Sequence, residues 1–391
     1  MSRRKFRSRA SIGVAAGASL LAACGKKEEP AKQEAAKAPA VVAPAVVGAP
    51  EVRWRLASSF PKALDTIFGA SEVFAKMVSD ATGGKFTIST HPAGELVPPF
   101  GVVDAVQNGT VECAHTAPYY FYGKDPTFSF DCAVPFGLNA RQQTAWLYEG
   151  NGMKLMREFY AQYNIVNFPM GSTGAQMGGW YRKEIKGLAE LKGLKMRISN
   201  LAGAIVSQLG VVPQTIPGGE IYTALEKGTI DAVEWVGPYD DEKLGFNKVA
   251  PFYYYPAWWE GGSQLSLYVN SKAYEALPAD YKAILAAAAS HAHVVMQATY
   301  DAKNPAALKR LVAAGAQLRP FSREILKAAY DAAMGLYGEL SAKNPNWKKV
   351  YEDYAKFRDD QHMWFRFTEA NFDNFMQTGR SAKKAAPAKK K

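Results

Sequence analysis

The alternation of apolar and polar residues predicts a strand–helix–strand order at the start of the folded region. Residues 51–56 alternate as a strand does, and apolar residues recur at helical spacing over 67–78. The pair Gly83-Gly84 would end that helix, and residues 85–90 alternate again. This order is typical of a βαβ unit, so the pattern predicts an α/β protein with a mainly parallel sheet.

Two segments, one in each half of the chain, repeat one local pattern. Residues 104–114 and 223–233 each combine a helix end, a glycine suited to the left-handed position past the helix, and a short apolar strand. The pattern does not recur at a fixed period, so it predicts the same supersecondary step in two lobes. Residues 115–117 and 234–236 should then lie at the carboxyl ends of strands, the edge that faces the ligand crevice in open α/β sheets.

The last third of the chain has a helical pattern almost throughout. After Pro278 the pattern predicts helices around 286–298, 323–340 and 351–375. Helices of this length are unusual inside a compact domain. We expect them to bridge two lobes or to reach a second subunit.

These elements predict two α/β lobes with a ligand cleft between them, the architecture of a periplasmic binding protein. Lobe I would comprise residues 51–172 and 262–305. Lobe II would comprise residues 173–261 and 306–379, including the C-terminal helices. Crossing strands near residues 172 and 262 would link the lobes.

The first 50 residues predict export and a tether. A basic stretch from Arg3 to Arg9 precedes an apolar stretch, 12–23, that is too short to span a bilayer. The basic stretch resembles a twin-arginine export signal, and residues 21–24 resemble a bacterial lipobox in which Cys24 becomes the lipidated first residue. An ordinary cleaved signal with an incidental cysteine is the alternative. Residues 25–50 lack aromatic residues and should form a disordered tether, so we expect a periplasmic protein held to a membrane by lipid at most.

Charge and cysteine usage refine this expectation. The net charge is +11, but residues 1–50 and 380–391 each carry +6, which leaves the body between them close to neutral. A nucleic-acid partner is therefore not expected, and the basic residues 380–391 should be a disordered tail. Cys113 and Cys132 could pair in an oxidising compartment, but export of a folded chain favours two buried thiols.

Common catalytic motifs do not assemble in this sequence. The Gly171–Gly174 segment has the wrong pattern for a dinucleotide or phosphate loop, and no Gly-x-Ser-x-Gly elbow occurs. Among the five histidines, only His291 and His293 are closely spaced, and they would lie on different faces of a helix. The sequence therefore favours a binding protein over an enzyme.

Four polar residues stand in unusually apolar surroundings. They are Gln176, Arg197, Glu234 and Glu260. A buried charge must be paired or must bind an ion, so these residues are candidates for a ligand site. Structural salt bridges at a rim are the alternative.

At these residues the chain resembles the solute receptors of tripartite ATP-independent periplasmic (TRAP) transporters, over roughly residues 54–375. The resemblance rests on the block Leu-Lys-Gly-Leu-Lys-Met-Arg at 191–197, on 220–232, and on Leu277-Pro278. Residues 174–180, Glu234-Trp235 and 258–260 resemble, more narrowly, the branch that binds 2-oxo acids or lactate with a metal ion.

The resemblance implies a specific set of site residues. The ion ligands would be Gln176, Glu234, the Trp235 carbonyl and Glu260; Arg197 would clamp the carboxylate; Asn200 and one of Tyr119, Tyr120 or Tyr122 would complete the substrate contacts. The resemblance also implies membrane transporter subunits as partners, and together with the long C-terminal helices it suggests a homodimer.

The chemistry of these residue types agrees with that set. Carboxylate, amide and carbonyl oxygens suit a hard cation such as sodium or calcium, and a guanidinium matches a carboxylate bidentately. Two glutamates, Arg197 and a monoanionic ligand leave a net negative charge, which sodium would halve and calcium would cancel. The choice between these two ions stays open at this point.

The sequence therefore predicts an extracytoplasmic solute-binding protein that captures a 2-oxo or 2-hydroxy monocarboxylate with a cation for a TRAP transporter. One alternative is a metal-dependent hydrolase or lyase that uses Glu234 and Glu260 as an acid/base pair. The other is a protein that presents its ligand to a membrane sensor.

Overall fold

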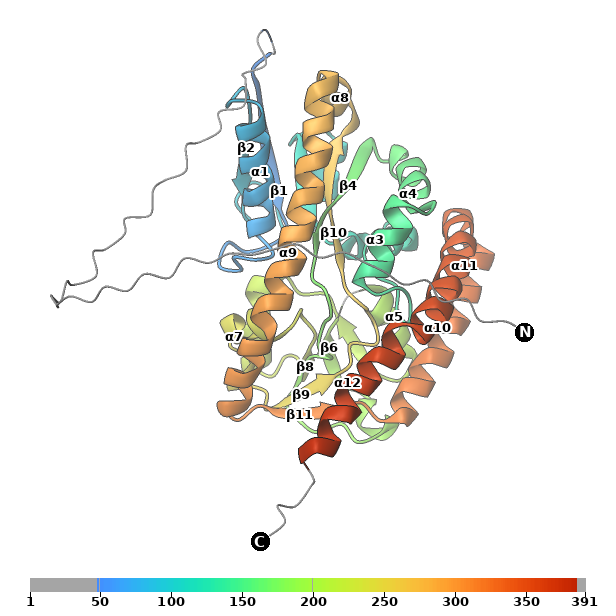
Figure 1. Ribbon diagram of the computed structural model, residues 1–391. Coiled ribbons are helices and arrows are strands. Elements are labelled where there is room, and N and C mark those ends of the chain that lie inside the picture. The colour runs from blue at the N-terminus through green and yellow to red at the C-terminus, as the bar shows by residue number, and fades with distance from the viewer. Residues whose placement is uncertain (1–47, 49, 199, 385–391) are drawn as a thin grey trace, which may run out of the picture. The chain divides into compact units, whose positions relative to one another are not determined.

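Two β-sheets form the framework of the described chain (Figure 1). The structure is a computed structural model that describes residues 48, 50–198 and 200–384. The export signal with Cys24, nearly all of the predicted tether, and residues 385–391 lie outside the described residues. Within the described part, no helix is both long and apolar enough to cross a bilayer.

The first sheet contains five strands in the order β2-β1-β3-β10-β4. These are β1 (Val52–Ser58), β2 (Phe86–His91), β3 (Cys113–Thr116), β4 (Ile165–Ser172) and β10 (Gln264–Asn270). β1 is parallel to both β2 and β3, whereas β10 is antiparallel to both β3 and β4. Helix α1 (Gly69–Ala81) connects β1 to β2, which confirms the βαβ unit predicted from the sequence.

The second sheet contains six short strands in the order β11-β9-β5-β8-β6-β7. These are β5 (Trp180–Tyr181), β6 (Lys195–Arg197), β7 (Val212–Gln214), β8 (Ala232–Val233), β9 (Phe252–Tyr255) and β11 (Gln317–Pro320). β5 is antiparallel to its two neighbours, and the other pairs are parallel. The first lobe is defined here by the five-stranded sheet and the second lobe by the six-stranded sheet.

The two segments that repeat a pattern in the sequence adopt the same local structure. The first is α2 (Val102–Gln107) followed by β3, and the second is α6 (Ile221–Glu226) followed by β8. Gly109 and Gly228 follow the helices with φ of 71° and 72°. Positive φ is accessible to glycine at little cost, so these residues let the chain turn from helix to strand.

Two antiparallel segments connect the lobes. β4 pairs with β10 up to Ser172 and Gln264, and the Thr173 amide then donates to the Ser263 carbonyl over 3.0 Å. The chain therefore leaves and re-enters the first lobe beside the predicted crossing points near 172 and 262.

The remaining helices cover the sheets and connect them. They are α3 (Ala140–Tyr148), α4 (Gly152–Ala161), α5 (Asn200–Gln208), α7 (Pro238–Leu244), α8 (Ser271–Glu275), α9 (Ala279–Ala313), α10 (Arg323–Lys343), α11 (Pro345–Phe367) and α12 (Glu369–Lys384). Helix α9 packs on α1 and β4 of the first lobe and on α7 of the second (Figure 1). Helix α10 packs on α5, while α11 packs on α3 and α4, so the late helices bridge the lobes as expected.

Three details differ from the sequence-based prediction. The predicted boundary at residue 305 falls inside α9, because this helix serves both lobes. The helix predicted over 351–375 is divided at Thr368, whose φ and ψ of −97° and −88° are not helical. Helix α12 extends to Lys384, so helical structure continues into the predicted tail.

Cys113 and Cys132 are buried free thiols, as favoured above.

Candidate functional site

A small cavity lies between the two sheets at the crossing segments. Its lining comes from the first lobe (Phe60, Ile67, Ala117, Tyr119, Tyr120, Leu265), the second lobe (Arg197, Trp235, Val236) and the crossing segments (Thr173, Gln176, Ser263). Ala117, Trp235 and Val236 directly follow β3 and β8, so these strand ends contribute to the cavity as the sequence predicts.

The predicted site residues take different positions around this cavity. Arg197, Gln176, Trp235, Tyr119 and Tyr120 line it directly. Tyr122 is outside the lining and packs against a hydrophobic cluster instead. Asn200 begins α5, and its side chain lies outside the described residues.

Arg197 is the last residue of β6 and is buried in the cavity wall. Its Nη1 donates to the Glu234 carboxylate (Oε2) and to the Glu234 carbonyl, each over 2.7 Å, and its Nε donates to the Ile216 carbonyl over 3.2 Å. The guanidinium carbon lies 4.9 Å from the centre of the Trp235 ring. These contacts hold the planar guanidinium in one orientation. Arg197 therefore forms a structural salt bridge and also lines the cavity.

Glu234 and Glu260 lie directly behind the cavity lining. Both are fully buried; Glu234 bonds to Arg197, and the Ser263 hydroxyl donates to Glu260. Burial raises the pKa of Glu260 well above its usual range, and the adjacent Glu234 carboxylate, which hydrogen-bonds with it, raises this pKa further. Two buried carboxyl groups in contact form a site of strong negative potential once both are ionised.

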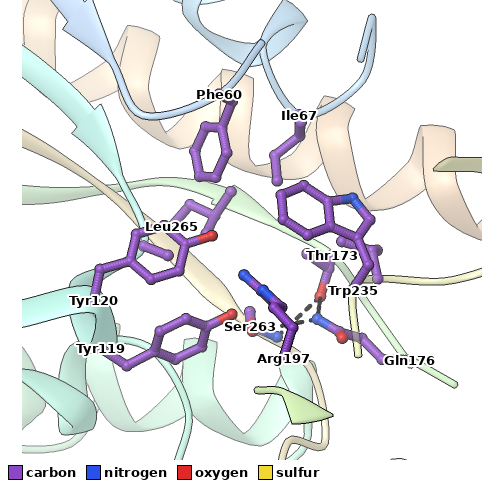
Figure 2. A pocket seen from close by; sticks show the side chains of 12 residues that line it. Phe60, Ile67, Tyr119, Tyr120, Thr173, Gln176, Arg197, Trp235, Ser263 and Leu265 are labelled. Carbon is purple, nitrogen blue, oxygen red and sulfur yellow. Dashed lines mark hydrogen bonds between the residues drawn. The ribbon is translucent and has the colours of Figure 1, made fainter. Parts of the chain in front are cut away.

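Gln176 brings an amide next to these carboxyl groups. Its Nε2 donates to Thr173 Oγ1 over 2.9 Å and to Ser263 Oγ over 3.3 Å (Figure 2). The other end of the amide lies 2.9 Å from the Trp235 carbonyl oxygen and 3.2 Å from Glu260 Oε1. The Gln176 amide therefore meets the Trp235 carbonyl oxygen and a Glu260 carboxylate oxygen at one point. Its oxygen faces them when Nε2 lies on the hydroxyls, and its nitrogen would donate to both if the amide turned over.

This donor set fits a hard cation. With the Gln176 oxygen turned towards the ion the convergent atoms are all oxygens, one of them from a carboxylate, and Glu234 adds a second carboxylate beside Glu260. Among residues 50–198 and 200–384, no group of three His, Cys, Asp or Glu side chains is arranged to hold a metal. A site here must therefore draw on amide and main-chain oxygens, which favour sodium or calcium over zinc or copper.

The opposite side of the cavity is apolar and was missed by the sequence analysis. Phe60, Ile67 and Leu265 gather on that side, facing Arg197 and Gln176 across the cavity (Figure 2). Isolated apolar residues carry no sequence signal that separates a cavity wall from a core. Thr173 and Ser263 were also missed, although each adjoins a glycine near a predicted crossing point.

Two α/β lobes, paired crossing segments and a cavity between the lobes define a two-lobed solute-binding protein. The chain belongs to the bacterial extracellular solute-binding proteins, family 7, which match residues 57–344, and it is a solute receptor of the TRAP transporter type.

Individual relatives extend over most of the chain. A monocarboxylate 2-oxoacid-binding periplasmic protein from Nostoc sp. is 52% identical over 328 residues, which cover 84% of this chain and 90% of the relative. A TRAP transporter solute-binding protein from Bordetella bronchiseptica has 52% identity and a TM-score of 0.84, covering 85% of this chain and 99% of that one. It is a mixed-occupancy dimer with copurified calcium and picolinate in the active site versus an apo site.

A TRAP periplasmic solute-binding protein from Pseudoalteromonas atlantica has 40% identity and a TM-score of 0.81. Its structure covers 83% of this chain and 99% of that one and contains bound sodium and pyruvate.

Proposed function

We propose that this protein captures a small 2-oxo or 2-hydroxy monocarboxylate together with a sodium or calcium ion and delivers it to the membrane subunits of a TRAP transporter. The observation that carries the proposal is the convergence of the Gln176 amide with the Trp235 carbonyl and Glu260 carboxylate oxygens beside Arg197. The ligands printed for the Bordetella and Pseudoalteromonas proteins support it, because pyruvate and picolinate are both carboxylates with a second donor atom beside the carboxylate.

Each part of the site has a distinct role in this proposal. Arg197 binds the ligand carboxylate through the guanidinium edge that faces the cavity. Gln176, Glu234, the Trp235 carbonyl and Glu260 would hold the cation, which supplies positive charge to a ligand that carries oxygen at C1 and C2. Tyr119 and Tyr120 close the first-lobe side of the cavity, with burial raising the pKa of Tyr120 to about 12, so its hydroxyl stays protonated at neutral pH.

The apolar wall of Phe60, Ile67 and Leu265 would contact the rest of the ligand. These side chains offer no charge to a second carboxylate, and burying an unpaired charge is costly. This favours monocarboxylates with apolar side chains over dicarboxylates.

The proposal is tested by removing metal from the protein and titrating pyruvate by calorimetry with sodium, with calcium, and with neither. Linkage is reciprocal, so the ion should raise pyruvate affinity by the same factor as pyruvate raises ion affinity. We expect at least a tenfold factor, because without the ion the only positive charge near an incoming carboxylate is Arg197, which Glu234 already pairs at low dielectric. Glu260→Gln should flatten this dependence. Equal pyruvate affinity in all salts of matched ionic strength would overturn the cation site.

The same samples test whether the protein is a receptor without catalytic activity. We expect NMR spectra of pyruvate, 2-oxobutyrate and lactate to stay unchanged during long incubation with the ion-loaded protein. Turnover of any of them would instead favour the hydrolase or lyase alternative, with Glu234 and Glu260 as its acid/base pair.

We further infer from the Leu-Ala-Ala-Cys segment that the exported protein is lipidated at Cys24. Replacing this cysteine in Cys24→Ala should move the protein from the membrane fraction to the soluble periplasm. A wild-type protein that is already fully soluble there would contradict lipidation.

We also infer a homodimer in which a second copy covers the aromatic face of α11 and α12. Five large apolar residues on these helices are more than half exposed: Met363, Trp364, Phe367, Phe372 and Phe375. A patch of this kind is rare on a monomer and typical of an interface. In native mass spectrometry, Phe367→Glu with Phe375→Glu should give a monomer, while Val212→Glu, an exposed apolar residue of β7, should not. A monomeric wild type would contradict the dimer.

A further inference from the structure

The hydroxyl of Thr173 already uses its proton and one of its two acceptor positions in hydrogen bonds. Its Oγ1 donates to the Gly174 carbonyl over 3.1 Å and accepts from the Ser263 amide over 2.9 Å. A hydroxyl has one proton and two acceptor positions. The remaining position of Thr173 can therefore only accept a hydrogen bond, and it accepts from Gln176 Nε2.

The hydroxyl of Ser263 is committed in the same way. Its single proton goes to Glu260 Oε2, so towards Gln176 it can only accept. Thr173 and Ser263 come from the two crossing segments, and both are buried. Together they present two lone pairs and no proton to the amide of Gln176.

The two hydroxyls and a cation together decide which end of the amide faces the Trp235 and Glu260 oxygens. When Nε2 donates to both hydroxyls, Oε1 faces the Trp235 carbonyl and Glu260, two acceptors that an amide oxygen meets favourably only with a cation between them. If the amide turned over, Nε2 would donate to Trp235 and Glu260, and Oε1 would need a proton from each hydroxyl. Both protons would then have to leave the Gly174 carbonyl and Glu260, so the turned amide exchanges these two bonds for its own and leaves an NH₂ group where the cation would lie.

We propose that Thr173 and Ser263 are positioning residues for the cation: they hold the Gln176 amide with its oxygen towards the ion and so set the ion affinity of the site. The inference rests on the proposed function and adds the two residues that select the orientation of the Gln176 amide. Neither hydroxyl needs to touch the ion.

The test measures calcium and sodium affinity of the full-length protein by calorimetry without organic ligand. Thr173→Val keeps the shape of the side chain but removes the acceptor, and Ser263→Ala removes the other. Each lost hydrogen bond changes the equilibrium between the two amide orientations by roughly tenfold, so we expect each variant to bind calcium about tenfold more weakly. Thr173→Ser should restore the affinity. Thr116→Val, which removes a buried hydroxyl bonded to Ser59 in the first lobe, is the matched control and should leave it unchanged.

A second set of variants, made in the Gln176→Glu protein, distinguishes positioning of the amide from a general loosening of the crossing segments. In Gln176→Glu both ends of the side chain are oxygens, so its orientation no longer matters. Thr173→Val should then change calcium affinity less than about twofold in this background. An equal loss in both backgrounds would overturn the positioning role, as would a Thr173→Val protein that binds calcium like the wild type. If the wild type binds neither ion, the proposed function fails first, and the two failures are therefore distinguishable.

Discussion

At the scale of single residues, Arg197 combines two tasks that usually fall to different side chains. Its Nη1 is committed to Glu234 and its Nε to a main-chain carbonyl, while the side chain still lines the cavity. A lysine ammonium has three donors around one point and cannot reproduce a planar fork with two separated nitrogens. The geometry therefore requires arginine and not merely a positive charge.

We expect Arg197→Lys to weaken pyruvate binding at least tenfold in calorimetry without unfolding the protein. Loss of a hydrogen bond to a charged group costs about 1.5–3 kcal/mol, and the Glu234 carboxylate would lose part of its compensation. Arg53→Lys, at an exposed position in β1, should leave pyruvate affinity unchanged. Normal affinity of the Arg197 variant would remove this residue from the site, and failure to fold would assign it a structural role alone.

The residues that sequence analysis could and could not select differ in a physical way. Arg197, Glu234 and Glu260 stand out because a charge among apolar neighbours conflicts with the surroundings. Thr173 and Ser263 are small, neutral and next to glycines, so nothing in their local sequence distinguishes a site residue from a turn residue. Their importance arises only when the two crossing segments bring them within hydrogen-bond distance of Gln176.

At the scale of elements, the turn from helix to strand is the feature that sequence predicts best. In both copies an amide past the glycine bonds back to the helix: Thr110 to the Ala105 carbonyl over 2.8 Å and Thr229 to the Ala224 carbonyl over 3.0 Å. The turn is local and needs a positive φ, so the glycine is visible in the sequence. The break at Thr368 has no such signal, because residues 351–375 keep a helical pattern on both sides of it.

The turn glycine gives a stability prediction with a built-in control. Gly109→Ala should lower the free energy of unfolding by about 1–2 kcal/mol, because an alanine at φ of 71° meets its own backbone. Gly338 lies inside α10 with open space around it, so Gly338→Ala should raise that free energy by up to about 1 kcal/mol. Urea unfolding of both variants measures the two effects, and equal shifts in one direction would contradict this account of the turn.

A buried carboxyl group, that of Asp131, bonds to β4 and β10 and makes the stability of the first lobe depend on pH. Burial raises the pKa of Asp131 from 3.8 to about 7, although Ser266, Tyr160 and Asn167 hydrogen-bond with it. Between these pH values the unfolded chain loses a proton that the native state keeps, so stability falls as pH rises through this window. Asp131→Asn abolishes this loss.

We therefore expect the melting temperature of Asp131→Asn, relative to wild type, to increase between about pH 4 and about pH 8. The comparison across pH cancels any constant packing effect of the substitution. A difference in melting temperature that is the same at both pH values would show that Asp131 does not titrate in this window.

At the scale of the whole molecule, the two lobes also meet away from the cavity. Asp65, which follows β1 in the first lobe, forms a salt bridge with Lys243 of α7 in the second, and Tyr239 of α7 donates to it over 3.0 Å. The Lys303 ammonium of α9 lies 3.8 Å from the same carboxylate. These contacts require the lobes to be close together.

Hinge closure is typical of periplasmic binding proteins, and a ligand held between two lobes leaves faster when the closed state is less favoured. Asp65 is about half exposed, with 54% of its side chain accessible, so each of its ion pairs contributes modestly, about 0.2–1 kcal/mol. We therefore expect Asp65→Ala to weaken pyruvate binding about two- to fivefold, almost entirely through faster dissociation in stopped-flow measurements. Asp80→Ala removes an exposed pair with Lys76 inside α1 of the first lobe and should leave both rates unchanged. If the Asp65 variant instead slowed association and kept the wild-type dissociation rate, Asp65 would assist encounter with the ligand and would not stabilise the closed lobes.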